Sequence, residues 1–394
     1  MVAYSAEELD GVMQPDSATC QNPFREFISR RGALQSQRWQ TEKETMQKIT
    51  SSGLMALTLA FLTEVDVRAA DIVRVGEGPF IAGGGYLIAR EKGYFKKLDI
   101  EIQPREFQDG ALAVPSMIAG EIEITTMTPN AALFNSVAKG AALTVILDRG
   151  TNRPGFAYTV VNVTQALYDQ GVKSLADFGK LKGKKVGVSG NGSINQYYVA
   201  KGLVKAGLDP AKDVQWIVNV PQPDLMRMLG QGQVDVTDLA YQFGFFAKNN
   251  KWGPIIVTDD QIEPNGPIAT YAIRKDYLEK NREVVIRWAT AYLQGVKEFN
   301  AAAQAPDQHP EIIDILAKNT ALNKSELVKA IAPNWGYLNE EGSPPVDAIM
   351  EIQDFWGGKY FNFVEKKIAR DQLFDVSVAK EAKARLDREK PFGP

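Results

Sequence analysis

The sequence has very little of the two side chains that most often build metal centres and nucleophilic sites. It contains one cysteine, Cys20, and one histidine, His309. A disulfide needs two cysteines and a typical structural zinc site needs four Cys or His ligands, so neither forms within one chain. Because Cys20 lies in a polar N-terminal stretch, a catalytic Cys20–His309 pair is disfavoured. Both counts argue against a thiol-dependent or zinc-dependent enzyme.

Positive charge is not in excess either. The chain has 45 Lys and Arg against 48 Asp and Glu, a formal net charge of −3. A nucleic-acid surface needs clustered cations to neutralise phosphate, so no nucleic-acid partner is expected. Hydrophobic residues make up 44% and charged residues 24% of the chain, which is typical of a globular protein. The length of 394 residues is enough for two domains.

The apolar run GLMALTLAFL at 53–62 is too short to span a bilayer. Lys43 and Lys48 precede it, and the small residues Val67 and Ala69 follow it. A basic region, a short apolar run and small residues before a cleavage point are typical of a secretory signal peptide. The alternative is a buried helix of the first domain.

We therefore expect a signal peptide at residues 46–70, cleaved after Ala69 or Ala70, and a periplasmic mature protein. Residues 1–45 are expected to be a non-native upstream extension, with Met46 as the true start, or disordered. A strand-like segment that begins near Asp71 follows directly.

Strand and helix signals alternate from residue 71 to residue 257 and then restart once, near Ser174. Such alternation predicts an α/β protein with mostly parallel sheets flanked by helices. Pro129 is expected to open the helix after the third strand. Further along, five apolar side chains recur at helical spacing and predict a long helix with one buried face. They are Val285, Trp288, Tyr292, Val296 and Phe299.

Two glycine-rich turns follow strands, at 76–81 and 189–193, and neither completes a nucleotide-binding motif. Ile81 and Asn195 stand where a third glycine is needed, and Pro79 removes a backbone N–H from the first turn. The second turn still suits an anion, because the first N–H groups of a helix have no intrahelical partner and its dipole favours negative charge. An ordinary N-cap is the alternative.

Four segments carry a resemblance to a known family. They are GGGYLIAREKGYF at 83–95, VPSMIAGEIEITTMTPNAAL at 114–133, TNRPGFAYTV at 151–160 and SLADFGKLKGKKVGVSGNGSINQYYVAKGLVKAGLDP at 174–210. Over residues 71–300 the chain resembles the ABC-importer solute-binding proteins of the nitrate, sulfonate and taurine group, which are related to thiamine-pyrimidine precursor proteins.

The resemblance implies a two-lobed periplasmic-binding-protein fold of type II with extra C-terminal helices. Lobe I would comprise 71–156 and 267–394, and lobe II would comprise 157–266. Each lobe would be a mostly parallel sheet flanked by helices. The aromatic cluster at 355–363 is expected to pack against lobe I.

The resemblance also implies a function. The protein would capture a small organic anion, a sulfonate or an aromatic carboxylate, in the interlobe cleft and deliver it to a membrane permease. It would act as a monomer, without a cofactor and without catalysis. The alternatives are a sensor module and an enzyme on the same fold, such as a thiamine-pyrimidine precursor synthase. The synthases carry a histidine and a cysteine-rich stretch that this chain lacks, which argues against the enzyme.

Carried over by position, the resemblance places the ligand contacts in loops at strand ends. They are Phe80, Gly83, Gly84, Gly85, Thr126, Met127, Thr128, Asn130, Thr151, Arg153, Ser189, Asn191, Ser193, Asp238, Tyr241 and Gln242. Arg153 could hold a carboxylate or sulfonate with two hydrogen bonds, or be a surface charge at the hinge. The aromatic side chains that could stack on a flat ligand, or belong to the core, are Phe80, Phe156, Tyr197 and Tyr241.

Overall fold

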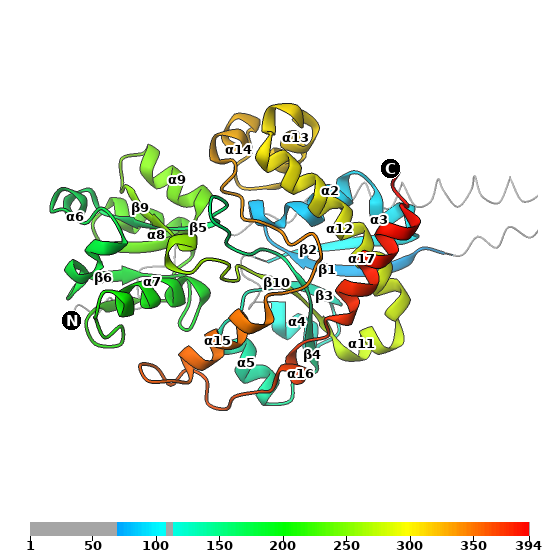
Figure 1. The fold of residues 1–394 in the computed structure, drawn as a ribbon, viewed down its shortest axis with the longest axis horizontal. Helices are drawn as coiled ribbons and strands as arrows, with labels where there is room; N and C mark the ends of the chain where they lie inside the picture. The colour runs from blue at the N-terminus through cyan, green and yellow to red at the C-terminus, as the bar shows by residue number, and fades with distance from the viewer. Residues whose placement is uncertain (1–68, 108–112, 394) are drawn as a thin grey trace, which may run out of the picture. The chain divides into compact units, whose positions relative to one another are not determined.

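The computed structural model describes residues 69–107 and 113–393, to which all structural statements refer (Figure 1). The expected signal peptide and upstream extension lie outside the described residues, apart from Ala69 and Ala70, which are exposed. Residues 68–394 form one unit by their internal contacts. Within it the strands form two separate five-stranded sheets.

The first sheet combines strands from two distant parts of the chain, in the order β2-β1-β3-β10-β4. Strands β2 and β3 pair with β1 in parallel, whereas β10 is antiparallel to both β3 and β4. The strands are β1 (Asp71–Glu77), β2 (Ile100–Glu106), β3 (Ile124–Met127), β4 (Leu143–Asp148) and β10 (Thr270–Arg274). All residues of β3 and β4 are buried, as expected for strands that are covered on both faces.

The second sheet has the order β7-β6-β8-β5-β9 and comes from one continuous segment. Strand β6 pairs in parallel with β7 and β8, and β5 is antiparallel to β8 and β9. The strands are β5 (Thr159–Val163), β6 (Lys185–Gly187), β7 (Gln215–Ile217), β8 (Val236–Ala240) and β9 (Ile255–Thr258). The expectation of mostly parallel sheets is confirmed. The one antiparallel strand in each was not foreseen, because a strand buried on both faces reads alike in either direction.

We call the first sheet with its helices lobe I and the second sheet with its helices lobe II; the residue boundaries given above stay a prediction. The helices of lobe II are α6 (Gln165–Asp169), η3 (Leu175–Leu181), α7 (Ile194–Lys205), α8 (Gln222–Gly230), α9 (Tyr241–Asn249) and α10 (Asp259–Ile262). The helices that precede and follow them are η1 (Ile81–Gly83), α2 (Gly84–Glu91), α3 (Tyr94–Lys97), α4 (Val114–Ile118), α5 (Ala131–Ala138), α11 (Lys275–Lys280), α12 (Arg282–Gln304), η4 (Pro306–Gln308), α13 (Pro310–Asn319), α14 (Ser325–Ile331), α15 (Val346–Trp356), α16 (Arg370–Leu373) and α17 (Ser377–Glu389).

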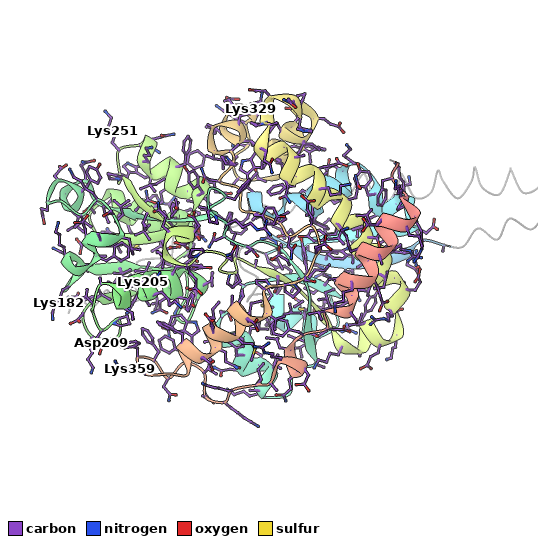
Figure 2. All side chains as sticks on the ribbon, viewed as in Figure 1. Lys182, Lys205, Asp209, Lys251, Lys329 and Lys359 are labelled. Carbon is purple, nitrogen blue, oxygen red and sulfur yellow. The ribbon has the colours of Figure 1, made fainter. Side chains whose placement is uncertain are left out.

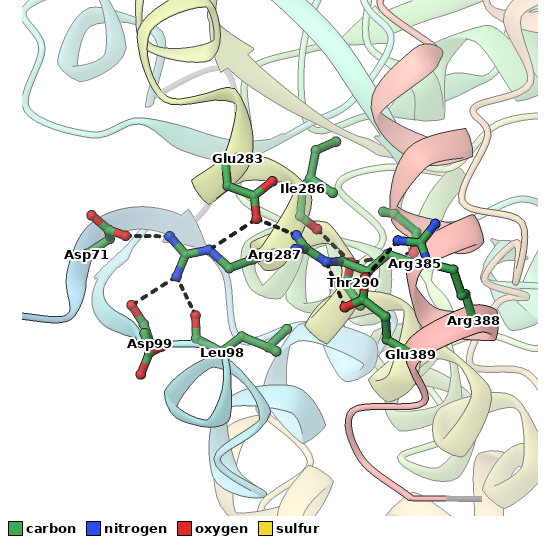
Figure 3. A network of polar contacts seen from close by, with 11 residues as sticks. Asp71, Leu98, Asp99, Glu283, Ile286, Arg287, Thr290, Arg385, Arg388 and Glu389 are labelled. Atoms are coloured by element: carbon green, nitrogen blue, oxygen red, sulfur yellow. Dashed lines mark hydrogen bonds and ion pairs between the residues drawn. The ribbon is translucent and has the colours of Figure 1, made fainter. Parts of the chain in front are cut away.

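The long helix α12 is the centre of the lobe I core and packs against α2 and α17 (Figure 1). All five apolar side chains of the predicted stripe are at most 1% exposed, from Val285 to Phe299, so that prediction is confirmed. Figure 3 shows how polar contacts add to this packing. Arg287 of α12 donates to the Leu98 carbonyl oxygen at 2.6 Å, and Arg385 of α17 forms an ion pair with Glu283 at 2.7 Å.

The helix after β3 begins later than predicted. Helix α5 starts at Ala131, with Asn130 as its N-cap, and Pro129 lies outside the helix. The Asn130 side-chain oxygen accepts a hydrogen bond from the Leu133 N–H at 2.8 Å. An asparagine at this position satisfies one of the free N–H groups of the first turn, and it therefore sets the start of the helix.

The aromatic cluster near the C-terminus packs against lobe I, as expected, and it also contacts lobe II, which was not foreseen. The Tyr197 ring of α7, in lobe II, lies 5.2 Å from the Phe355 ring and 6.2 Å from the Trp356 ring. On the lobe I side, Asn135 of α5 donates to the Phe363 carbonyl oxygen at 2.7 Å. The contact with lobe II was not foreseen because Tyr197 is distant in sequence from the cluster.

Charged side chains cover the outside of the molecule. Figure 2 shows Lys182, Lys251 and Lys359 extending away from the ribbon, and all three are exposed. Among the described helices, none combines the length and the apolar character that crossing a membrane requires.

Candidate functional site

Two adjoining cavities lie where lobe I faces lobe II. We call them the inner chamber, of about 70 Å³, and the outer chamber, of about 470 Å³. Both are lined by residues at the carboxyl ends of strands, where open α/β sheets bind ligands. The chambers share five lining residues, so we treat them as one cleft. The shared residues are Phe80, Thr128, Ser189, Ser193 and Gln222.

The start of helix α7 forms one wall of the cleft. Ser193 is its N-cap, and the Ser193 hydroxyl oxygen accepts from the Gln196 N–H at 3.2 Å. Gly192, just before it, has a φ of +70°, a conformation that glycine adopts without strain. Ile194 and Asn195 of the first turn line the inner chamber. The first N–H groups of a helix lack intrahelical partners, which makes this wall suitable for an anion.

A buried ion pair between Glu77, at the end of β1, and Arg149, after β4, lies at the inner chamber. Arg149 Nη2 and Nε donate to the Glu77 carboxylate at 2.6 and 3.1 Å, and the two side chains are 5% exposed or less. Burial opposes the charge on Arg149, but Glu77 raises the pKa of the guanidinium overall. The Tyr271 hydroxyl also donates to Glu77, at 2.6 Å. Within the described part of the chain, Arg149 is the one charged residue that lines either chamber.

Arg153, in contrast, lies outside the cleft. Its side chain is exposed, and its guanidinium stacks on the Tyr337 ring at 3.6 Å from the ring centroid. Arg153 begins a turn in which the Phe156 N–H donates to the Arg153 carbonyl oxygen at 2.8 Å. Thr151 lies in the same connection between β4 and β5, which we call the crossover, and its hydroxyl donates to Asp148 at 2.9 Å. Of the two interpretations of Arg153, the structure favours the surface charge at the hinge.

Three of the expected contact residues pack against other parts of the protein and do not line the cleft. A Cβ at Gly84 would lie 2.1 Å from the Phe299 ring of α12, and one at Gly85 would lie 2.9 Å from the Tyr292 ring. These glycines allow α2 to approach α12 closely, which explains the glycine-rich sequence without a ligand. Met127 is fully buried. Gly83 lies behind the ion pair, where a Cβ would be 3.1 Å from Arg149 Nη2.

Two buried carboxyl groups lie beneath the lobe II wall of the cleft. Asp238 lies in the middle of β8 and Asp259 begins α10, and both have 0% exposure. Asn195 donates to Asp238, and the Thr159 hydroxyl donates to Asp259. Burial raises the pKa of Asp238 well above its usual value and raises the pKa of Asp259 to about 7. The two carboxyls therefore hold at least one proton near neutral pH.

The remaining expected residues of α9 contact lobe I and the crossover. The Ile81 N–H of η1 donates to Gln242 Oε1 at 3.2 Å. The Tyr241 N–H donates to the Tyr158 carbonyl oxygen at 2.6 Å. The Ala131 N–H of α5, in lobe I, donates to the Gly192 carbonyl oxygen, in lobe II, at 3.1 Å. The two lobes are therefore joined directly by hydrogen bonds.

The structure brings seven of the expected residues together around the chambers. They are Phe80, Thr126, Thr128, Asn130, Ser189, Asn191 and Ser193. Sequence reasoning missed several further lining residues. They include Arg149, Tyr158, Thr159, Asn195, Tyr198, Asn219 and Gln222. Arg149 directly follows β4, and Thr159 begins β5. Their position at strand ends was the sequence signal that could have identified them as lining residues.

Of the candidate stacking residues, only Phe80 lines the cleft. The Phe156 ring instead meets Tyr337 edge-on at 6.0 Å. Among the described residues, no group of three or more His, Cys, Asp or Glu side chains is arranged to hold a metal ion. His309 caps α13 and lines neither chamber.

Comparisons with known proteins agree with this architecture. A protein of Brucella abortus strain 2308, described by name as a binding protein, is 26% identical over 276 residues, which are 69% of this chain and 79% of that protein. The periplasmic nitrate-binding protein NrtA from Synechocystis PCC 6803 superposes with a TM-score of 0.66 at 13% identity, covering 82% of this chain and 91% of that one. The alkanesulfonate-binding protein SsuA from Xanthomonas axonopodis pv. citri, bound to MOPS, gives 0.58 at 16%, covering 80% and 98%.

At these identities the solved structures establish the fold, which is the periplasmic-binding-protein fold. The family model described as NMT1-like matches residues 71–317, more than half of the chain. With its two mixed sheets and the cleft at their strand ends, the chain belongs to the NMT1-like family.

Proposed function

We propose that this protein is the periplasmic substrate-binding component of an ABC importer. It captures a small organic anion, a sulfonate or an aromatic carboxylate, in the interlobe cleft and delivers it to a membrane permease. The observation that carries the proposal is the cleft itself, whose walls come from both lobes and meet at strand ends. Relatives that are named as binding proteins support the same function.

An anion suits the cleft for two reasons. Arg149 uses Nε and Nη2 to bind Glu77, which leaves N–H groups of its fork available to a ligand. The N-terminus of α7 contributes a favourable dipole on the facing wall, where the Gly192, Ser193 and Gln196 N–H groups are bonded to protein acceptors and Ile194 and Asn195 line the inner chamber. Among the described residues, no carboxylate lines either chamber, so a negative ligand meets no like charge at the cleft surface.

Binding without chemical conversion is the expected activity. His309 lies away from the cleft, and the lining residues are hydroxyl, amide and apolar side chains plus Arg149. Incubation of the protein with a bound anion should return that anion unchanged, as checked by mass spectrometry over hours. Conversion beyond one equivalent would contradict the binding role.

Calorimetric titration with benzoates, alkanesulfonates and neutral pyrimidines tests the anion assignment. The double variant Glu77→Gln/Arg149→Met removes both charges together, so that neither is left buried without a partner. It should bind anions roughly tenfold to a hundredfold more weakly and leave any binding of neutral pyrimidines unchanged.

The matched control is Arg153→Met, which changes an exposed arginine outside the cleft and should leave anion affinity intact. Thermal unfolding confirms that each variant is folded. If neutral pyrimidines bind best and the double variant keeps the parent affinity, the anion assignment is wrong.

A further inference from the structure

The direction of the hydrogen bonds around the cleft restricts what a ligand must offer. A hydroxyl whose proton is already donated to a protein group can only accept from a ligand. A hydroxyl whose oxygen already accepts from a protein N–H still has a proton to donate. Both kinds occur in the cleft.

The donor side of the cleft is formed by Arg149, Thr128 and Ser193. The Thr128 hydroxyl oxygen accepts from Asn130 Nδ2 at 3.1 Å. The orientation of the Asn130 amide is set by its oxygen, which caps α5. The Ser193 hydroxyl oxygen accepts from a backbone N–H of α7. Each of the two hydroxyl groups therefore keeps a proton that it can donate to a ligand. Together with the free N–H groups of Arg149, these protons suit the oxygens of an anion.

The acceptor side is formed by Ser189 and Thr159 in lobe II. Asn195 Nδ2 donates to Asp238, which fixes the Asn195 amide with its oxygen toward Ser189. The Ser189 hydroxyl donates to that oxygen at 3.0 Å. The Thr159 hydroxyl donates to Asp259 Oδ2. Each of the two cleft hydroxyls thus has its proton committed and presents only lone pairs to the chamber.

The buried carboxyl pair keeps the acceptor side in this state. Asp238 Oδ2 and Asp259 Oδ1 are buried and have no hydrogen-bond partner among the described residues, and burial raises the pKa of both carboxyls. A proton bound to either carboxyl is best placed on the oxygen that has no donor, which leaves Asp238 Oδ1 and Asp259 Oδ2 as acceptors. Asn195 and Thr159 therefore have no alternative to donating toward them.

Resting on the proposed function, we propose that the ligand is a small organic anion that also carries an O–H or N–H group, which donates to the Thr159 and Ser189 oxygens. The acceptor atoms of the anion face Arg149 and Thr128 in lobe I, and the protic group faces lobe II. One ligand then bridges both lobes. An analogue without the protic group leaves buried lone pairs without a partner, which costs affinity.

Two pairs of compounds that differ by a hydroxyl against a methyl group test this inference by calorimetry. They are para-hydroxybenzoate with para-methylbenzoate, and hydroxyethanesulfonate with propanesulfonate. We expect the hydroxyl member of at least one pair to bind about tenfold to a hundredfold more tightly than its methyl partner. Thr159→Val should remove most of that difference by weakening the hydroxyl member and sparing the methyl one.

The matched control is Thr237→Val on β8, where a fully buried threonine has a hydroxyl without a partner among the described residues and lines neither chamber. It should preserve the discrimination. If Thr159→Val fails to fold, Ser189→Ala provides the second test and should also narrow the difference. Methyl members that bind as tightly as hydroxyl members, in every pair that binds, would overturn the inference and leave the proposed function standing. Failure of every anion to bind, with binding of neutral pyrimidines, would overturn the proposed function and the inference with it.

Discussion

At the scale of single residues, the buried pair Asp238 and Asp259 links cleft chemistry to the pH dependence of stability. Burial raises the folded-state pKa of Asp259 to about 7, and the neighbouring carboxyls of Asp260 and Glu263 contribute to that rise. In the unfolded chain an aspartate has a pKa of about 3.9. Between these two pKa values the folded protein holds a proton that the unfolded chain releases. The contribution of Asp259 to the free energy of unfolding is therefore fully present below about pH 3.9 and is lost as the pH rises through about 7.

Asp259→Asn tests this sign. Asparagine carries no charge but keeps a side-chain oxygen for the Thr159 hydroxyl. We expect the variant to be more stable than the parent at about pH 8, with a smaller fall in melting temperature between about pH 5 and pH 8, because each pKa unit corresponds to about 1.4 kcal/mol. Thermal unfolding at several pH values measures it.

Asp177→Asn is the contrasting variant. Lys180 and nearby donors lower the pKa of Asp177 to about 2. The contribution of Asp177 to the free energy of unfolding is therefore present above about pH 3.9 and is lost on acidification. That variant should lose stability at neutral pH. An Asp259→Asn protein that is less stable than the parent in mildly alkaline buffer would contradict the carboxyl-pair interpretation.

At the scale of elements, the turn before α7 decides how closely the lobes approach. A Cβ at Gly192 would lie 2.7 Å from the Ala131 Cβ of α5, and the Gly192 carbonyl oxygen accepts from the Ala131 N–H. Gly192→Ala should therefore weaken ligand binding by obstructing closure, in addition to the cost of about 1 kcal/mol for alanine at a positive φ. Calorimetry and thermal unfolding separate the two effects.

Gly207 is the matched control, because it has a φ of +81° and a Cβ added there would meet nothing within 4 Å. Gly207→Ala should lower stability by a similar amount and leave affinity unchanged. Equal affinity in the Gly192→Ala and Gly207→Ala proteins would show that this contact does not matter for closure.

At the scale of the whole molecule, binding is expected to shift the population toward the state in which the lobes are joined. Two backbone N–H groups report on that state, Ile81 bonded to Gln242 and Ala131 bonded to Gly192. Hydrogen exchange of both should slow when a saturating anion is present. The Val188 N–H, bonded to Ile217 within lobe II, should exchange at the same rate with and without it. Slowing at all three positions alike would indicate general stabilisation and not closure.

The C-terminal aromatic cluster belongs to the same scale, because it contacts both lobes through Tyr197 and Asn135. A segment with contacts on both sides moves with one lobe and slides on the other, or limits the opening. The contacts of this cluster could not be predicted from the spacing of its aromatic residues. Such spacing indicates that the residues are buried, but it does not indicate which part of the protein covers them.

Local features of this protein were readable from the sequence by itself. The α12 stripe and the strand–helix alternation depend on periodicity and on a few neighbouring residues, so they could be predicted without knowing the fold. The family resemblance added the two-lobed architecture. The expected loops did reach the cleft at Phe80, Thr128, Ser189 and Ser193, although contact with a ligand stays a prediction there.

Side-chain direction and long-range pairing were decided only by the tertiary structure. Arg149 and Arg153 lie on the same short segment, yet one forms a buried pair with Glu77 and the other stacks on Tyr337. Both partners are distant in sequence, and their approach depends on how β1 and the C-terminal segment meet the crossover. Asp238 and Asp259 likewise come near one another because β5 pairs with both β8 and β9. No local pattern records which distant side chain arrives at a given strand end, because that is a property of the packed chain.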